Sequence, residues 1–142
     1  MDIRITPSPL KGTVAAVSSK SAAHRIMIMA ALCGSPTHLL LNSRNDDMTA
    51  TAHCMAALGC RVEEQPDGLL LTPGPLPAAM PRLHCGESGS TLRFLLPVAA
   101  ALGCGGCFTG SGRLPRRTVA ALVNELTATA APPTGRRACP SP

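Results

Sequence analysis

The sequence predicts an α/β fold that contains an internal repeat. Short apolar segments of strand length alternate with longer segments that have helical periodicity. Polar turns rich in small residues lead into such helices twice, at 18–21 and at 86–93. After each turn an arginine and a helix-ending glycine recur at nearly the same interval, Arg25 with Gly34 and Arg93 with Gly103. We therefore expect two units with the same order of strand, anion-type turn and helix.

The composition is that of one modest globular domain. The chain has 142 residues, and 45% of them are hydrophobic, which argues against wholesale disorder. It contains two Phe and no Tyr or Trp, so the core must consist of Leu, Val, Ile, Met and Ala. The net charge of +5 favours anionic partners. Nucleic acid and membrane partners are not expected, because stacking aromatics, a dense basic run and a span-length apolar segment are all missing.

The first unit begins with extended chain. Residues 3–17 contain prolines and end in a short predicted strand at 14–17. A helix is expected over 21–33, and residues 37–41 predict a short buried strand. The apolar face of this first helix would consist of Ile26, Met29, Ala30 and Cys33.

A second helix is expected over 46–58, capped by Asp46 or Asp47. Two strands follow at 61–64 and 69–72, joined by a turn that contains Pro, Asp and Gly. The apolar stripe of the helix would consist of Met48, Ala52, Met55 and Ala56.

The second unit follows a proline-rich connector at 73–81. An apolar helix is expected at 94–102, and Pro97 should kink it or mark its first turns. A strand at 106–110 comes next, then a basic turn, and then a helix at 118–126.

The character of the chain changes after residue 126. Residues 127–142 have no periodicity and several prolines, so we expect a disordered tail. The last helix looks unfinished, and our hypothesis is that the reading frame shifts near residue 127. Residues 1–126 would then form a partial domain.

The cysteines and histidines give no sign of a metal site. Seven cysteines at irregular spacing, without a leader peptide before them, predict reduced thiols in a cytoplasmic protein. Cys104 and Cys107 form a lone CxxC without a second ligand pair, so no metal is expected. The histidines, His24 among them, lack a catalytic context and are expected to be structural or exposed.

Three basic turns are the candidate functional residues. Each lies at the start of a predicted helix, where free N–H groups and the helix dipole favour an anion. Taken singly, the first turn is better explained as a serine cap with two solvated basic residues, because such caps are common. The three sets are Lys20, Ser21 and Arg25; Gly89, Ser90 and Arg93; and Arg113, Arg116 and Arg117.

Four motifs in order resemble the enolpyruvyl transferase family. They are Ser-Lys-Ser with Arg25, Asp-Asp followed by Ala-Leu-Gly, Gly-Glu-Ser-Gly-Ser-Thr-Leu-Arg, and Gly-Arg-Leu-Pro-Arg-Arg. Lys20 followed by Ser21 is similar to the branch that acts on shikimate-3-phosphate, because the branch acting on UDP-N-acetylglucosamine has Lys-Asn there. The resemblance implies an inside-out barrel of repeated βαβαββ units in two similar domains. This chain would hold one full unit and part of a second, and residues 3–12 would pack in the other domain.

The resemblance also implies a reaction and residue roles. The reaction transfers the enolpyruvyl group of phosphoenolpyruvate to the 5-hydroxyl of shikimate-3-phosphate in chorismate biosynthesis, without a cofactor and in a monomer. Lys20 matches the catalytic lysine that touches both substrates, and Ser21 and Arg25 match ligands of shikimate-3-phosphate. Gly89 and Arg117 match residues that bind phosphoenolpyruvate. Glu87, where many members have Asn, Ser90 and Arg93 would be supporting residues, and Thr118 departs from the usual proline.

The resemblance places the proton-transfer acids of the family in the second domain. We therefore expect this chain to be inactive alone. Two alternatives remain open: a small phosphate- or anion-binding module, and half of an assembly that a second polypeptide completes.

Overall fold

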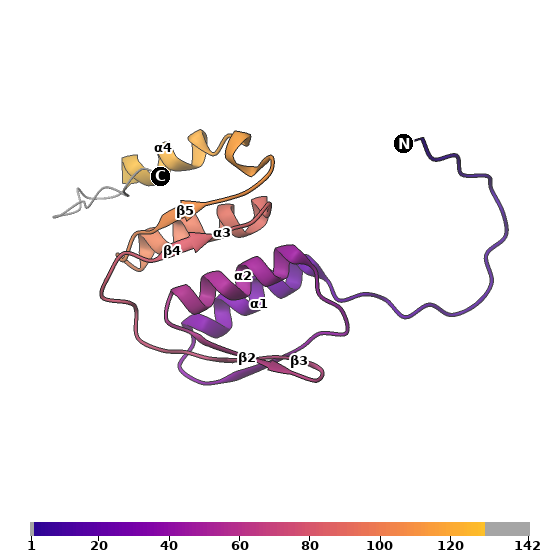
Figure 1. The fold of residues 1–142 in the computed structure, drawn as a ribbon, viewed down its shortest axis with the longest axis horizontal. Helices are drawn as coiled ribbons and strands as arrows, with labels where there is room; N and C mark the ends of the chain where they lie inside the picture. Colours follow the sequence, from indigo (N-terminus) through magenta and orange to yellow (C-terminus); the bar gives the residue numbers. More distant parts are fainter. Residues whose placement is uncertain (1, 130–142) are drawn as a thin grey trace.

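The computed structural model describes residues 2–129 and shows a mixed α/β architecture, which confirms the predicted fold class (Figure 1). The first unit consists of α1 (Lys20–Leu32), β1 (Thr37–Leu40), α2 (Asp46–Ala57), β2 (Arg61–Gln65) and β3 (Gly68–Thr72). The second consists of β4 (Arg82–His84), α3 (Gly89–Ala101), β5 (Cys107–Thr109), the 3-10 helix η1 (Leu114–Arg116) and α4 (Ala120–Thr129). The order helix, strand, helix occurs in both units. In Figure 1, α1 and α2 lie over the sheet that contains β2 and β3, and the second unit stacks beyond them.

Serine and asparagine caps set where the first three helices begin. Ser19 accepts a hydrogen bond from the Ala22 N–H at the start of α1, and Asn45 accepts one from the Met48 N–H at the start of α2. The predicted cap at Asp46 or Asp47 is therefore wrong. Both aspartates lie in the first turn of α2, where the positive end of the helix dipole stabilises their negative charge.

The helix α3 begins earlier than the sequence predicts. Ser88 accepts a hydrogen bond from the Thr91 N–H, so the helix starts at Gly89 instead of residue 94. Pro97 consequently lies in the interior of α3 and not in its first turns. The polar segment before Phe94, which has turn-like composition, is the capped first turn of the helix.

The larger sheet is antiparallel with the strand order β1-β3-β2. The predicted hairpin is confirmed, with Gln65 of β2 opposite Gly68 of β3. Gly68 has to be glycine, because a Cβ there would lie 1.9 Å from the Leu39 carbonyl oxygen of β1. The strand expected at 37–41 is confirmed as β1, but its expected burial is wrong, because β1 is at the edge of the sheet and only Leu39 in it is buried.

The smaller sheet joins β4 and β5 in parallel, with Leu83 opposite Phe108. The strand expected at 106–110 is confirmed as β5. The repeat predicts a strand before the second turn without giving its bounds, and β4, which has three residues and follows the proline-rich connector, is that strand. Leu83 is completely buried, so β4 contributes to the core despite its length.

The core is rich in methionine and leucine, as the composition predicts. Its largest fully buried apolar side chains are Met27, Met48, Met55, Leu69, Leu71, Leu83 and Leu95. The predicted apolar faces are partly wrong, because Met29 of α1 is 60% exposed and Ala56 of α2 is also exposed. The buried face of α1 is centred on Ala23, Met27 and Ala30, since α1 packs against both α2 and β3.

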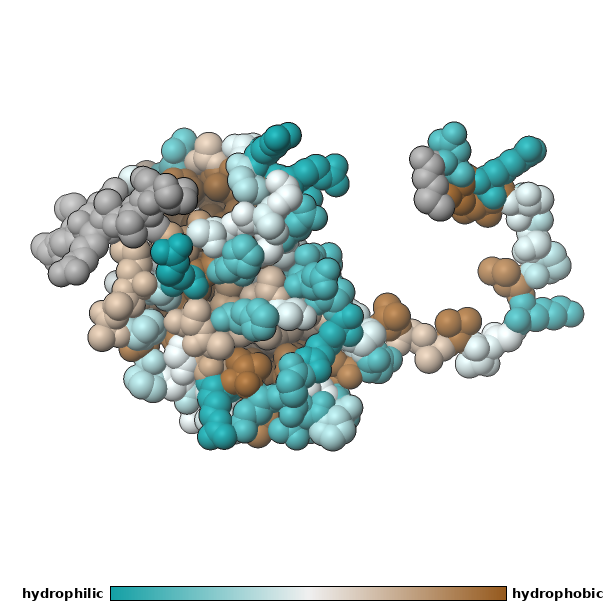
Figure 2. Space-filling view, viewed as in Figure 1, coloured by the Kyte–Doolittle hydropathy of each residue, from teal (hydrophilic) through white to brown (hydrophobic). Residues whose placement is uncertain are grey.

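Residues 2–17 form an extended arm that leads away from the body (Figure 1). The strand predicted at 14–17 is wrong, because no backbone partner lies beside it within the described chain. The inner end of the arm is held by Asn42, whose side-chain amide donates to the Ala16 carbonyl at 2.7 Å. Figure 2 shows apolar groups along the arm, away from the body. The exposed large apolar residues of the arm are Ile3, Ile5, Leu10, Val14 and Val17.

The last described element, α4, contains no buried residue. It continues to Thr129, so residues 127–129 of the expected disordered tail are helical. The rest of that segment, residues 130–142, lies outside the described residues. No helix in residues 2–129 combines the length and the apolar character needed to cross a membrane.

Candidate functional site

The first basic set lies at the N-terminus of α1. Lys20 is the first residue of the helix, and its Nζ is 2.8 Å from Oδ2 of Asp47 in the first turn of α2. The two side chains are 48% and 28% exposed, so a ligand from solvent can reach the pair. The sequence reading did not identify Asp47 as the partner of Lys20, because this contact depends on how α1 and α2 pack.

Arg25 lies one turn along the same face of α1. Its guanidinium donates to the Ser21 carbonyl at 2.8 Å and also contacts the Ser21 hydroxyl. The spacing that predicts a shared face for Ser21 and Arg25 is therefore confirmed. The guanidinium carbon also lies 4.8 Å from the centre of the Phe94 ring, a cation–π contact that connects α1 to α3.

The second basic set gathers at the N-terminus of α3. A Cβ built on Gly89 would lie 2.8 Å from a guanidinium nitrogen of Arg93 and 2.9 Å from one of Arg117. Both guanidinium groups therefore lie over the bare backbone of Gly89. Within residues 2–129, neither side chain has an ion pair or a hydrogen bond. Two unpaired cations beside the positive end of a helix favour an anion between them.

The loop that carries Arg117 is held against the start of α3. The Ser111 N–H donates to the Gly86 carbonyl at 2.8 Å, and the Glu87 carboxylate accepts from the Arg113 N–H at 3.0 Å. Leu114 of η1 is buried and packs into the core. Glu87 thus supports the loop, which places Arg117 over Gly89. Ser90, the second residue of α3, is half-buried.

The two basic sets lie at the same end of the helix layer. Lys20 contacts the Asp47 side chain, while the Thr91 hydroxyl near the start of α3 lies 3.4 Å from the Asp47 carbonyl. The N-termini of α1, α2 and α3 therefore meet around Asp47. Of the third basic set, Arg117 lies at Gly89, whereas Arg113 and Arg116 line an open hollow beside it with Arg117.

A buried polar group links these helix starts. Nδ1 of His24 lies 2.7 Å from the Thr51 hydroxyl, which lies 2.7 Å from the Thr91 hydroxyl. Burial lowers the pKa of His24 below its ordinary value, with Asp47 opposing and Lys20 reinforcing the shift. The sequence expectation of a structural histidine is confirmed, but no sequence signal pointed to its threonine partners.

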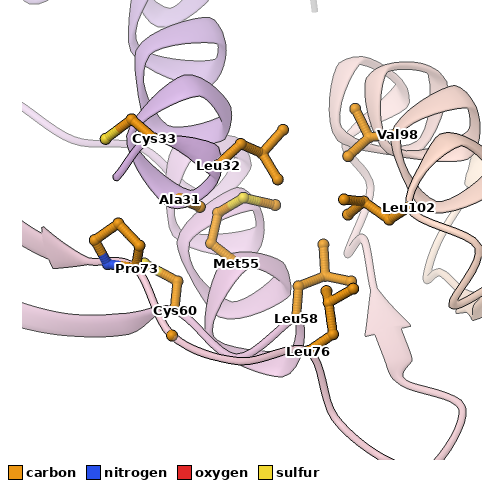
Figure 3. Close-up of a pocket in the computed structure, with 11 residues that line it drawn as sticks. Ala31, Leu32, Cys33, Met55, Leu58, Cys60, Pro73, Leu76, Val98 and Leu102 are labelled. Carbon is orange, nitrogen blue, oxygen red and sulfur yellow. The ribbon is translucent and has the colours of Figure 1, made fainter. Parts of the chain in front are cut away.

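The opposite end of the same helices is apolar. A pocket of about 200 Å³ lies where the C-terminal ends of α1, α2 and α3 approach the connector after β3 (Figure 3). Side chains from all three helices and from the connector point into it, among them Leu32, Met55, Leu58, Leu76, Val98 and Leu102. No charged residue lines this pocket, so it lacks the groups that would hold an anion.

Among the described residues, five cysteines are free thiols: Cys33, Cys54, Cys60, Cys85 and Cys104. The expectation that the cysteines are reduced is wrong for Cys107, which is disulfide-bonded. In the described part of the chain, no three His, Cys, Asp or Glu residues are grouped so that they could hold a metal ion.

The sequence and the fold were compared with known proteins. The family model for EPSP synthase (3-phosphoshikimate 1-carboxyvinyltransferase) matches residues 5–138. The 3-phosphoshikimate 1-carboxyvinyltransferase of Clostridium kluyveri is 37% identical over 116 residues, which are 81% of this chain and 27% of that protein. The enzyme of the same name from Methanocorpusculum labreanum is 30% identical over 142 residues, or 98% of this chain and 34% of that protein.

A solved structure shares the fold. The EPSP synthase from Acinetobacter baumannii superposes with a TM-score of 0.66 at 23% identity, over 82% of this chain and 27% of that chain. The chain thus spans about a third or less of the length of the proteins it matches. Since the family model covers nearly the whole sequence and the motifs occur in the family's order, this chain belongs to the EPSP synthase (3-phosphoshikimate 1-carboxyvinyltransferase) family.

Proposed function

We propose that the chain supplies one side of the substrate site of an enolpyruvyl transferase. The reaction would transfer the enolpyruvyl group of phosphoenolpyruvate to the 5-hydroxyl of shikimate-3-phosphate and release phosphate. The observation that carries the proposal is the convergence of two guanidinium groups, those of Arg93 and Arg117, over the backbone of Gly89, where neither forms an ion pair with another described residue. A phosphate and a carboxylate on one small substrate suit such a pair of cations.

The two basic sets would divide the substrates between them. Ser21 and Arg25 are proposed to bind the phosphate of shikimate-3-phosphate, and Gly89 and Arg117 to bind phosphoenolpyruvate. Lys20 would touch both substrates. The contact of Lys20 with Asp47 supports this role, because Asp47 also lies beside the Thr91 hydroxyl near the start of α3.

The chemistry would be an addition followed by an elimination. The 5-hydroxyl loses its proton to a base and its oxygen adds to C2 of phosphoenolpyruvate, while C3 takes up a proton, which gives a tetrahedral ketal. The ketal then loses a proton from C3 and expels phosphate, so the enol ether forms without any change in oxidation state. Fixed cations near the phosphate and carboxylate stabilise the charge that develops in both steps. The bare backbone at Gly89 lets a phosphate oxygen approach the free N–H groups of α3.

We expect the chain alone to bind phosphoenolpyruvate without turning it over. The family resemblance places the proton-transfer acids in the part of the relatives that this chain does not cover. The test is release of phosphate from phosphoenolpyruvate and shikimate-3-phosphate, together with a calorimetric titration of phosphoenolpyruvate. Turnover by the chain alone would contradict the expectation. Turnover only after addition of the remaining part of a relative would support a two-chain assembly.

A pair of neighbouring arginines provides the matched control. Arg117→Gln should weaken phosphoenolpyruvate binding by roughly tenfold or more, the loss expected for a charged hydrogen bond. Arg116→Gln removes the same charge from the adjacent residue, which does not lie over Gly89, and should change binding much less. Equal losses of affinity in both variants would indicate that phosphoenolpyruvate binds to a general basic surface and not specifically at Gly89. Equal affinity of the wild-type chain for inorganic phosphate and phosphoenolpyruvate would favour the simpler anion-binding module.

A further inference from the structure

A continuous chain of buried hydrogen bonds crosses the three helices beneath the candidate site. It runs from His24 of α1 through Thr51 of α2 to Thr91 of α3, and from there to Ser88, the N-cap of α3. Each of its three links measures 2.7 Å. Every member is at most 1% exposed, so water cannot replace any of these contacts.

The direction of the hydrogen bonds follows from counting protons. The Thr91 hydroxyl donates to the Ser88 oxygen, which also accepts the Thr91 N–H. A hydroxyl has a single proton, so the next link requires Thr51 to donate to Thr91. His24 must then donate its Nδ1 proton to Thr51.

The other ring nitrogen of His24 supports this direction. Its Nε2 is buried and has no hydrogen-bond partner among the described residues. If each group donates to the next from His24 to Ser88, the Nε2 atom of His24 carries no proton and is an unpaired acceptor. In the reverse order Nε2 would carry a proton and be a buried donor without a partner, which proteins avoid more strictly than an unpaired acceptor.

The chain of hydrogen bonds ends where the proposed phosphate site begins. Ser88 satisfies the N–H of Thr91, and the N–H groups of the first two residues of α3, Gly89 and Ser90, have no partner inside the helix. Ser88 immediately precedes Gly89, over which Arg93 and Arg117 lie. A shift of the Ser88 cap would therefore change the direction of the two N–H groups that face the ligand.

We propose that His24 is a positioning residue for the anion site. As the neutral Nδ1–H tautomer it fixes, through Thr51 and Thr91, the Ser88 cap that aims the Gly89 and Ser90 N–H groups at a phosphate. This inference rests on the proposed binding of phosphoenolpyruvate at Gly89 and adds a role for four side chains that the proposed site does not otherwise use.

The surroundings of His24 keep the ring neutral. Burial lowers its pKa, and the positive charges of Lys20 and Arg25 act in the same direction, while Asp47 opposes them. The Phe94 ring also packs edge-on against His24, with the ring centres 6.3 Å apart, and it carries no charge.

The first test measures the tautomer directly. Long-range ¹⁵N–¹H NMR spectra of the full chain, labelled at histidine nitrogen, distinguish the Nδ1–H form, the Nε2–H form and the imidazolium. We expect the proton on Nδ1 and a bare Nε2 at neutral pH. A proton on Nε2 in either form would overturn the proposed direction, whether or not the chain binds phosphoenolpyruvate.

The second test measures binding of phosphoenolpyruvate by the full chain. Thr51→Val breaks the chain of hydrogen bonds at constant shape and should weaken binding by about three- to tenfold, whereas Thr51→Ser should restore it. Met55→Ala is the matched control, because Met55 is equally buried one turn along α2 and lies outside the hydrogen-bond chain. It should lower the melting temperature and leave the affinity of the folded protein unchanged.

Several outcomes separate the two proposals. Wild-type affinity in folded Thr51→Val, or an equal loss in Met55→Ala, would overturn the positioning role. If Thr51→Val does not fold, the positioning role is judged from two other results: the tautomer of His24 and the affinity of Thr51→Ser for phosphoenolpyruvate. If the wild-type chain fails to bind phosphoenolpyruvate, the proposed function fails and the positioning role fails with it, even where the tautomer is as expected.

Discussion

Asp47 partly neutralises the lysine that the proposed site would present to phosphate. In the structure, Lys20 Nζ and Asp47 Oδ2 are 2.8 Å apart, so a phosphate that approaches Lys20 has to compete with a carboxylate. Asp47→Asn keeps the size and the first-turn position of the side chain but removes its charge. We predict that this variant binds phosphoenolpyruvate more tightly than the wild-type chain.

The exposure of the pair sets the magnitude. Two unit charges 4 Å apart attract by about 1 kcal/mol in water and about 4 kcal/mol at an effective dielectric constant of about 20. The Lys20 and Asp47 side chains are 48% and 28% exposed, so the effective dielectric constant around the pair is closer to that of water. Exposed pairs contribute roughly 0.2–1 kcal/mol, so the affinity should rise by a factor between about 1.4 and about 5.

The adjacent residue offers a control for the helix dipole. Asp46 lies in the same first turn of α2 but takes part in none of the ion pairs found within residues 2–129. Asp46→Asn should therefore change the affinity less than Asp47→Asn does. Titration of phosphoenolpyruvate into ¹⁵N-labelled protein at low ionic strength measures both. The difference should shrink at higher salt, where charges are screened beyond about 10 Å at 0.1 M.

Weaker binding by Asp47→Asn would refute this reasoning. It would mean that the carboxylate holds Lys20 in its binding position, and that this outweighs the electrostatic competition. Equal gains in both variants would instead assign the effect to the overall charge near the start of α2.

Two further predictions concern stability. Because burial lowers the pKa of His24 below its ordinary value of 6.5, the unfolded chain takes up a proton before the folded chain does as the pH falls. The free energy of unfolding should therefore decrease below about pH 6.5, and His24→Asn should flatten this dependence in urea unfolding curves; a stability that rises in this window would contradict the assignment. Leu83→Ala should cost about 2–5 kcal/mol in the same assay, because Leu83 is completely buried in β4. Its exposed neighbour gives the control, since Arg82→Ala should stay within about 0.5 kcal/mol of the wild type, and similar losses in both would remove β4 from the core.

Local sequence signals predict the helices and the hairpin that are defined by interactions within a single element. The helices at 21–33 and 46–58 and the hairpin at 61–72 were predicted within a few residues, because caps, apolar period and a Pro-Asp-Gly turn act within one element. The exact burial of α1 was not predictable in this way. Met29 is exposed because the position of α2 and β3, rather than the period of α1, decides which of its apolar residues face the core.

Short strands depend on partners that the local sequence does not show. Residues 14–17 have strand-like composition but find no backbone partner, whereas β4 has only three residues and forms a strand because β5 lies beside it. The start of α3 likewise depends on a hydrogen bond that the sequence does not show. Its polar first turn looks like a loop until the hydrogen bond from the Thr91 N–H to Ser88 is known.

The candidate site shows the same division between local and long-range information. The family motifs point to Lys20, Gly89 and Arg117 individually as candidate site residues, since each motif is a short run of sequence. Their meeting at one end of the helix layer depends on contacts made far along the chain, such as that of Lys20 with Asp47.

Threonine gives no functional signal in a helical pattern, because its hydroxyl usually faces solvent or the preceding turn. Thr51 and Thr91 are informative only once they are seen to be completely buried and 2.7 Å apart across two helices. A buried hydroxyl is costly unless it is hydrogen-bonded, and an apolar residue at either position would avoid that cost. The hydroxyls are therefore better explained by what they hold in place than by stability alone, and what they hold is the Ser88 cap beside Gly89. The Thr51→Ser and Thr51→Val variants separate these two explanations, because only a positioning role requires binding to follow the hydroxyl.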